Sequence, residues 1–129
     1  MAHPNEELVR KGYEAFLSGD MATLAELIDE NVVWHVPGSS PISRTYYGRN
    51  EVFGFFATLM QETGGELRLT VHDMVGNDDH VVTLVKGEAT RNGRTLVSDS
   101  VHVAHVRGGQ MTEFWEFDAD QRASDEFWS

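Results

Sequence analysis

Cysteine is absent from the 129-residue chain. Its absence excludes disulfide bonds, thiolate zinc sites and cysteine nucleophiles, and it gives no evidence on the redox compartment. No apolar run approaches the ~20 residues that a membrane-spanning helix needs. The N-terminal segment, residues 1–12, carries acidic side chains and lacks the apolar region of a signal peptide. We therefore expect a cytoplasmic protein without a membrane anchor.

Basic side chains are also scarce. The chain has 10 lysines and arginines against 21 aspartates and glutamates, which gives a formal net charge of -11. A surface of this sign repels phosphate backbones and anionic lipid headgroups, and no cluster of basic residues overcomes the repulsion. Nucleic acids and membranes are therefore not expected as partners.

The first half of the chain has helical periodicity, and the chain length indicates a single domain over residues 1–129. Val9, Tyr13 and Phe16 are spaced i, i+4, i+7, which predicts a helix that Asn5 could cap. A short second helix is expected after Gly19, with Asp20 as its cap, and a brief extended piece at residues 32–36 follows it. A third helix is predicted from near residue 50 to the glycine pair at 64–65, and residues 39–48 between these helices are expected to form a loop.

The second half alternates between apolar and polar residues, as strands do. Four strands are predicted at residues 66–75, 80–90, 95–106 and 111–117. Asn92-Gly93 is a strong signal for a two-residue hairpin turn. Helices first and hairpins second predict an α+β fold in which three helices pack on the concave face of a curved antiparallel sheet.

Four segments carry a resemblance to a known family. They are "YEAFLSGD" in the first helix pair, "DENVVWHVPG" after it, "YGRNEVFGFF" at the third helix and "GGQMTEFWEF" in the last strand. In this order they resemble SnoaL-like proteins of the nuclear-transport-factor-2-like and ketosteroid-isomerase-like superfamily, over roughly residues 5–128. The resemblance implies a cone-shaped α+β barrel with a pocket between sheet and helices. That superfamily includes isomerases, polyketide cyclases, epoxide hydrolases, dehydratases and non-catalytic binding domains, so the fold alone does not give the function.

The resemblance also implies roles for single residues. His35 corresponds to the catalytic carboxylate of ketosteroid isomerases if one inserted residue is allowed, and an imidazole there could act as a general base. His102 corresponds to their oxyanion donor, while their oxyanion tyrosine falls on Gly12, one residue from Tyr13. Glu116 or Asp118 corresponds to the catalytic aspartate region of SnoaL-like enzymes. A buried His35 that only bonds the backbone is the alternative.

Strand alternation predicts which side chains share the pocket face. The family registration turns His102 and Ser100 inward, along with Glu116 and Asp118. A slip of one residue would turn Trp115 inward instead. The expected pocket lining is mainly apolar and consists of Phe16, Trp34, Phe56, Thr83, Val85, Ser100 and Phe114.

These residues predict an acid/base enzyme of the isomerase, cyclase, lyase or hydrolase kind that acts on a small apolar ketone-like molecule without a cofactor. A non-catalytic binding pocket is the first alternative. The second is an association module, because the opposite sheet face is apolar enough to form a homodimer through Val82, Leu84, Val101, Val103, Trp115, Phe117, Phe127 and Trp128. A metal site made of His35, His102 and Glu116 is conceivable, but nothing else in the sequence demands one, so no metal is expected.

Overall fold

The computed structural model describes residues 2–129, which form four helices and one sheet of six strands. The helices are α1 (Pro4–Ser18), α2 (Met21–Leu27), α3 (Arg49–Thr63) and α4 (Gln121–Trp128). The strands are β1 (Ile28–Val36), β2 (Arg44–Tyr47), β3 (Leu67–Gly76), β4 (His80–Arg91), β5 (Arg94–Arg107) and β6 (Gln110–Asp118). The predicted α+β class is confirmed.

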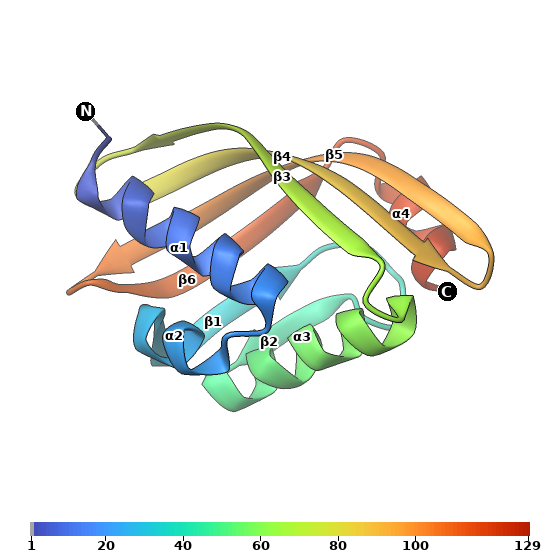
Figure 1. The fold of residues 1–129 in the computed structure, drawn as a ribbon, viewed down its shortest axis with the longest axis horizontal. Helices are drawn as coiled ribbons and strands as arrows, with labels where there is room; N and C mark the ends of the chain where they lie inside the picture. The colour runs from blue at the N-terminus through green and yellow to red at the C-terminus, as the bar shows by residue number, and fades with distance from the viewer. Residues whose placement is uncertain (1) are drawn as a thin grey trace.

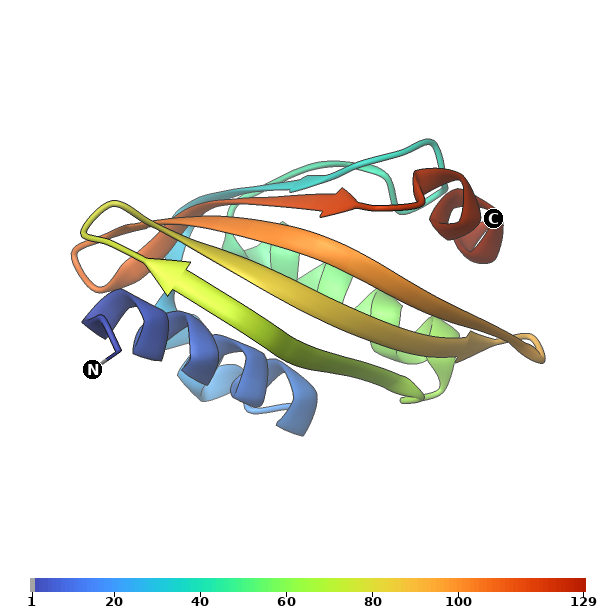
Figure 2. The same cartoon turned by 90° about the horizontal axis from the view of Figure 1, so that it is seen from above.

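The six strands form a curved sheet in the order β2-β1-β6-β5-β4-β3 (Figure 1). Strands β1 and β6 run parallel, whereas every other neighbouring pair is antiparallel. The sheet is therefore mixed rather than fully antiparallel, and it stays open at β2 and β3 rather than closing into a barrel. Helices α1 and α3 lie on its concave side, and α4 lies at the end of the sheet where β6 ends (Figure 2). The expected cone-like shape holds.

Local sequence signals account for most element ends. Gly19 adopts φ 72, a left-handed conformation that ends α1, and Asp20 caps α2 by accepting a hydrogen bond from the Thr23 N–H. The expected cap of α1 at Asn5 is wrong, because His3 occupies that position and its ring accepts from the Asn5 N–H. Pro4 then takes the first helical position, where a missing N–H costs nothing.

The hairpin strands follow the predicted ranges to within one or two residues. Asn92 and Gly93 both have positive φ, 53 and 73, as the tight turn between β4 and β5 requires. Two elements were not predicted. Strand β2 lies within the segment expected to be a loop and pairs with β1, and α4 follows the last strand.

The core lies between the concave sheet face and helices α1 to α3. Trp34 packs face to face on Phe114, with ring centroids 3.8 Å apart, and meets the edge of Phe56 from α3. Ile28, Val32 and Trp34 alternate with more exposed residues along β1, so the inner face of the strand is the apolar one. Within residues 2–129, no helix combines the length and apolar character needed to cross a membrane.

Candidate functional site

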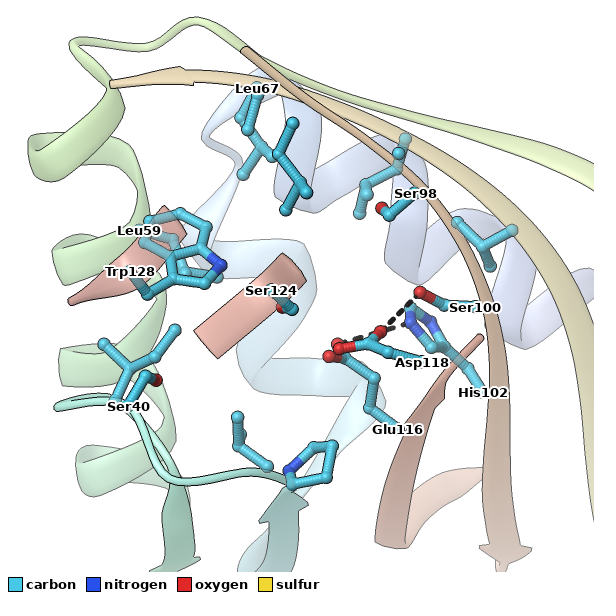
Figure 3. Close-up of a pocket in the computed structure, with 18 of the residues that line it drawn as sticks. Ser40, Leu59, Leu67, Ser98, Ser100, His102, Glu116, Asp118, Ser124 and Trp128 are labelled. Carbon is cyan, nitrogen blue, oxygen red and sulfur yellow. Dashed lines mark hydrogen bonds and ion pairs between the residues drawn. The ribbon is translucent and has the colours of Figure 1, made fainter. Parts of the chain in front are cut away.

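A cavity of about 100 Å³ opens between the concave sheet face and helices α3 and α4 (Figure 3). One side of its wall is polar, with His102, Glu116 and Asp118 projecting inward from β5 and β6, and Leu59 and Trp128 lie on the opposite side. A second, more apolar hollow of about 80 Å³ adjoins it. The two hollows share Phe16, Phe55, Leu59, Leu69, His102 and Glu116. The polar groups therefore stand where an apolar ligand would contact them.

The register between β5 and β6 brings the polar side chains together. His102 lies directly opposite Glu116, and Ser100 lies directly opposite Asp118. Residues two apart on a strand point to the same face, so both pairs project into the cavity. Trp115, the residue before Glu116 on β6, points to the outer face, where it stacks on His35.

A partly buried chain of polar contacts runs from α1 to β6. The Tyr13 Oη lies 2.7 Å from His102 Nδ1, and His102 Nε2 lies 3.5 Å from Glu116 Oε1. Burial raises the pKa of Tyr13 far above its usual range, against a lowering by the nearby Thr83 hydroxyl, and the charge of Glu116 adds to the rise. Tyr13 therefore keeps its proton and donates it to Nδ1, which leaves the ring N–H on Nε2, pointing at Glu116.

The two carboxylates titrate in opposite directions. Burial alone would raise the pKa of Glu116, but the hydrogen bond and charge of His102, with a bond from Asp118, hold it below its usual range. Burial and the negative charge of Glu116 raise the pKa of Asp118 to about 6, although the Ser100 hydroxyl donates to its Oδ1 at 2.6 Å. The site thus holds an ionised carboxylate beside one that keeps its proton in weakly acidic solution.

Helix α4 covers the open end of the larger hollow. Its Asp125 accepts hydrogen bonds from the Ser39 N–H and hydroxyl, both at 3.1 Å. Gly38 packs so tightly on this helix that a Cβ there would overlap the Asp125 carboxylate, and its φ of +96 also favours glycine. On the other side, Arg91 donates to the Phe127 carbonyl at 2.9 Å. These contacts hold Ser124 and Trp128 in the cavity wall.

The prediction that His35 faces the cavity is wrong. Its ring lies on the outer sheet face, because β1 turns Trp34 and Val36 inward and the residue between them outward. There Nε2 lies 2.7 Å from Glu113 Oε2, Nδ1 lies 3.1 Å from Thr45 Oγ1, and the ring stacks on Trp115. His35 thus cannot join His102 and Glu116 around one metal ion, and the part of the chain that the structure describes holds no other cluster suited to a metal.

The other predicted site residues divide into groups. His102, Glu116, Asp118, Phe16, Val85 and Ser100 line the larger hollow, whereas Tyr13, Trp34, Phe56 and Phe114 line the smaller one. Thr83 lines neither hollow and is buried behind the wall. The expectation that Phe127 and Trp128 pack on the outer sheet face is wrong, because α4 folds back and buries Phe127.

Several lining residues were not predicted. They include Leu59, Leu67, Leu69, Leu96, Gln121 and Ser124, with Ser40 and Ser43 from the loop before β2. Ser98 also lines the cavity, as the alternation that turns Ser100 inward predicts. The sequence contains one signal for the start of α4. Asp120 caps this helix by accepting a hydrogen bond from the Ala123 N–H.

Comparison with known proteins agrees with this architecture. Residues 9–114 match the SnoaL-like domain. Bal32a, from a soil-derived mobile gene cassette, superimposes with a TM-score of 0.95 at 38% identity, over 98% of this chain and 97% of its own. IdmH, a putative polyketide cyclase from Streptomyces antibioticus, gives a TM-score of 0.77 at 26% identity, over 92% and 94% of the two chains.

A curated relative extends the comparison. The uncharacterized protein Rv0034 of Mycobacterium tuberculosis (strain ATCC 25618 / H37Rv) is 29% identical over 124 residues, which cover 95% of each chain. The domain match spans most of the chain, including α1 from Val9 onward, the first five strands and the part of β6 up to Phe114. The chain belongs to the SnoaL-like domain family.

Proposed function

We propose that the protein is an acid/base enzyme that binds a small, largely apolar molecule with a carbonyl group and moves protons on it. The observation that carries the proposal is the carboxylate pair on the cavity wall, in which one pKa is lowered and its neighbour's is raised to about 6. Proteins assign a base and an acid at one site by giving two carboxyl groups different surroundings, which move their pKa values in opposite directions.

Glu116 would act as the base and Asp118 as the acid. Glu116 takes a proton from the carbon next to the carbonyl, the C–H electron pair forms a carbon–carbon double bond, and Asp118 gives its proton to the carbonyl oxygen. The product of this step is an enol. In a ketone with a carbon–carbon double bond one carbon farther along, the enol is a conjugated dienol; return of the first proton to the far end of that dienol, with return of the oxygen-bound proton to Asp118, shifts the double bond and completes an isomerisation. Attack of the enol on a second carbonyl would complete a cyclisation.

His102 and Tyr13 support this chemistry as positioning residues. The His102 ring bridges Tyr13 and Glu116, and the N–H on its Nε2 side helps to hold the pKa of Glu116 below its usual range, so this partly buried carboxylate stays ionised. This arrangement replaces the base role predicted for His35, whose ring lies on the other face of the sheet.

The shape of the cavity supports the substrate class. The smaller hollow is lined by Val9, Leu24, Ile28, Trp34, Phe56, Met111 and Phe114, which suit a ring or branched hydrocarbon group. The larger one adds the hydroxyls of Ser98, Ser100 and Ser124 beside Asp118, which suit oxygen substituents. A small oxygenated ketone of the polyketide kind has both features, and IdmH is a putative polyketide cyclase.

Exchange of deuterium from D₂O into a panel of cyclic and polyketide-like ketones, followed by NMR, would test the proposal whatever the final product is. We expect exchange with the wild-type protein and a loss of about 100-fold or more in Glu116→Gln, since general base catalysis contributes at least that much. Glu113→Gln is the matched control, because Glu113 pairs with a histidine on the outer face. Equal rates in the wild type and Glu116→Gln would overturn the role of Glu116. Tight binding of such ketones with no exchange would instead indicate a non-catalytic binding pocket.

A further inference from the structure

The hydroxyl of Thr83 has no hydrogen-bond partner. Thr83 is 1% exposed, and among residues 2–129 its Oγ1 is the buried side-chain oxygen or nitrogen that neither donates nor accepts. Buried polar groups are bonded in the large majority of cases, because a group removed from water without a new partner destabilises the fold. An apolar side chain of the same shape, valine, would avoid this loss. The hydroxyl therefore calls for an explanation other than stability.

Thr83 is the strand neighbour of His102 and is buried beside the polar groups of the cavity wall. It faces inward from β4, with its Cα opposite that of His102 on β5. Its hydroxyl is close enough to the phenol of Tyr13 to lower that group's pKa, although the two do not form a hydrogen bond. Tyr13 instead uses its proton on His102 Nδ1, at 2.7 Å.

A second proton on His102 would reverse the hydrogen bond to Tyr13. A neutral ring accepts at Nδ1, but a charged ring has an N–H there and can only donate. The Tyr13 oxygen would then become the acceptor, and its own hydroxyl hydrogen would have to turn to another oxygen. The groups that face His102 are Tyr13 from α1, Glu116 and Phe114 from β6, with Asp118 beyond Glu116, and Thr83 from β4. Of these, Glu116 is already engaged on the Nε2 side, so the free oxygen beside the phenol belongs to Thr83.

We propose that Thr83 is a positioning residue, whose hydroxyl accepts a hydrogen bond from Tyr13 when His102 becomes protonated. The change is a rotation of the Tyr13 hydroxyl, so no covalent bond forms or breaks. It lets the wall of the cavity hold a second proton on His102 without leaving the phenol hydrogen unpaired. The use that the site would make of this hydrogen bond rests on the proposed function. The hydrogen bond itself depends only on the protonation of His102, whether or not turnover occurs.

Titration of the histidine rings by NMR in Thr83→Val and Thr83→Ser proteins tests this role. In Thr83→Val the charged form of His102 loses its supporting acceptor, so we expect its titration midpoint to move to lower pH by about one unit. Thr83→Ser keeps the hydroxyl and should titrate as the wild type does. His35, on the other sheet face, is the internal control, and its midpoint should not move in either variant. Thermal unfolding should show Thr83→Val to be at least as stable as the wild type, which a purely structural role would not allow.

The Tyr13→Phe background provides the second test, since the proposed effect passes through the phenol. Adding Thr83→Val to Tyr13→Phe should leave the His102 midpoint where Tyr13→Phe alone places it. If Thr83→Val does not fold, Thr83→Ala serves in its place in both backgrounds. An unchanged midpoint in the hydroxyl-free variant overturns the proposal, as does a shift of the same size in Thr83→Ser or in the Tyr13→Phe background. None of these measurements involves a substrate, so their failure is distinct from failure of the proposed enzyme activity.

Discussion

The two faces of the sheet carry similar pairs of side chains in opposite surroundings. On the outer face His35 lies 2.7 Å from Glu113, and about a third of each side chain is exposed. On the inner face His102 lies 3.5 Å from Glu116, and the side chains are 8% and 28% exposed, so the contrast in burial lies mainly at the histidine. The inner pair, although its two side chains lie farther apart, belongs to a cluster in which the pKa values of Tyr13, Glu116 and Asp118 are all shifted.

The difference shows that burial, rather than pairing, gives the inner face its chemistry. An ion pair in contact with water gains little, because the solvent screens the charges and can hydrate each of them separately. Inside the cavity wall the histidine loses most of its hydration and the glutamate part of it, so each one depends more on the charges and hydrogen bonds of its neighbours. The effect of a substitution on the inner face can therefore be compared with the effect of the matching substitution on the outer face.

The largest contrast is expected between two tryptophans on neighbouring strands. Trp34 packs against Phe114 and Phe56 in the core, whereas Trp115 stacks on His35 at the outer face. Trp34→Ala should lower the free energy of unfolding by about 3–5 kcal/mol, because it leaves a cavity in the core. Trp115→Ala should cost clearly less. Urea unfolding of the two variants measures both values, and equal losses would contradict the assignment of the core to the inner face.

Asp118 should make the stability of the fold depend on pH. Its pKa is about 6 in the folded protein and near 3.8 without the fold, so the folded state holds this proton more tightly. The wild type therefore loses stability as the pH rises from about 4 to about 6, and none of this loss is present below both values. Asp118→Asn, which cannot ionise, should equal the wild type in stability at pH 3 and exceed it at pH 8 by about 2 kcal/mol, less than the roughly 3 kcal/mol of the full shift because solvent reaches Asp118 in part.

Glu113→Gln is the control for this experiment. Its outer-face partner His35 is open to solvent, so the substitution should not produce the same pH-dependent gain. Chemical unfolding at a series of pH values gives the two curves. A pH-independent difference between Asp118→Asn and the wild type would show that the carboxyl group is not held in its neutral form by the fold.

The hydrogen bonds to the two histidines should contribute differently to the free energy of unfolding. Tyr13→Phe removes the donor to His102 and leaves a buried Nδ1 without a partner, which should cost about 1–3 kcal/mol. Thr45→Val removes the partner of His35 Nδ1, but water can replace it at this exposed ring, so the loss should be clearly smaller. Thermal unfolding at pH 7 compares them, and the reverse order would show that the His102 network is not what stabilises that region.

The smallest effect on stability is expected at the outer face, where the sequence predicts a homodimer. Leu84 and Phe117 are 40% and 54% exposed there. Leu84→Asp should change the free energy of unfolding of the monomer by no more than about 0.5 kcal/mol, as surface substitutions usually do. If this face joins two copies, the same substitution should convert a dimer into a monomer in sedimentation equilibrium. A wild-type protein that stays monomeric at all concentrations would contradict the predicted homodimer.

Local rules accounted for most of the elements and for the face of each hairpin strand. Alternation along β5 and β6 is a property of neighbouring residues, so the inward direction of His102, Glu116 and Asp118 could be read from the sequence once one residue was placed. Strand β2 was missed because its four residues are too few to show a period. The parallel pairing of β1 with β6 joins segments far apart in the chain, and no local signal reports it.

His35 shows where reasoning from a family position failed. Val32, Trp34 and Val36 are apolar at every second position of β1, which already places the histidine on the opposite face. The comparison with ketosteroid isomerases needed an inserted residue, and an insertion of one residue in a strand reverses the direction of every side chain after it. The abnormal pKa of Asp118 was beyond sequence reasoning, because it depends on burial and on the charge of Glu116 in three dimensions.

Gly87 offers a handle for redesign of the cavity. It lies on β4 opposite Ser98, and a methyl group added at this position would stand 2.7 Å from the serine Oγ. The hollow is thus wider at this point because Gly87 has no side chain. Paired changes at these two positions, such as a larger residue at 87 with glycine at 98, would move space from one strand to the other. Selectivity for bulky or slender ligands could then be changed without altering His102, Glu116 or Asp118.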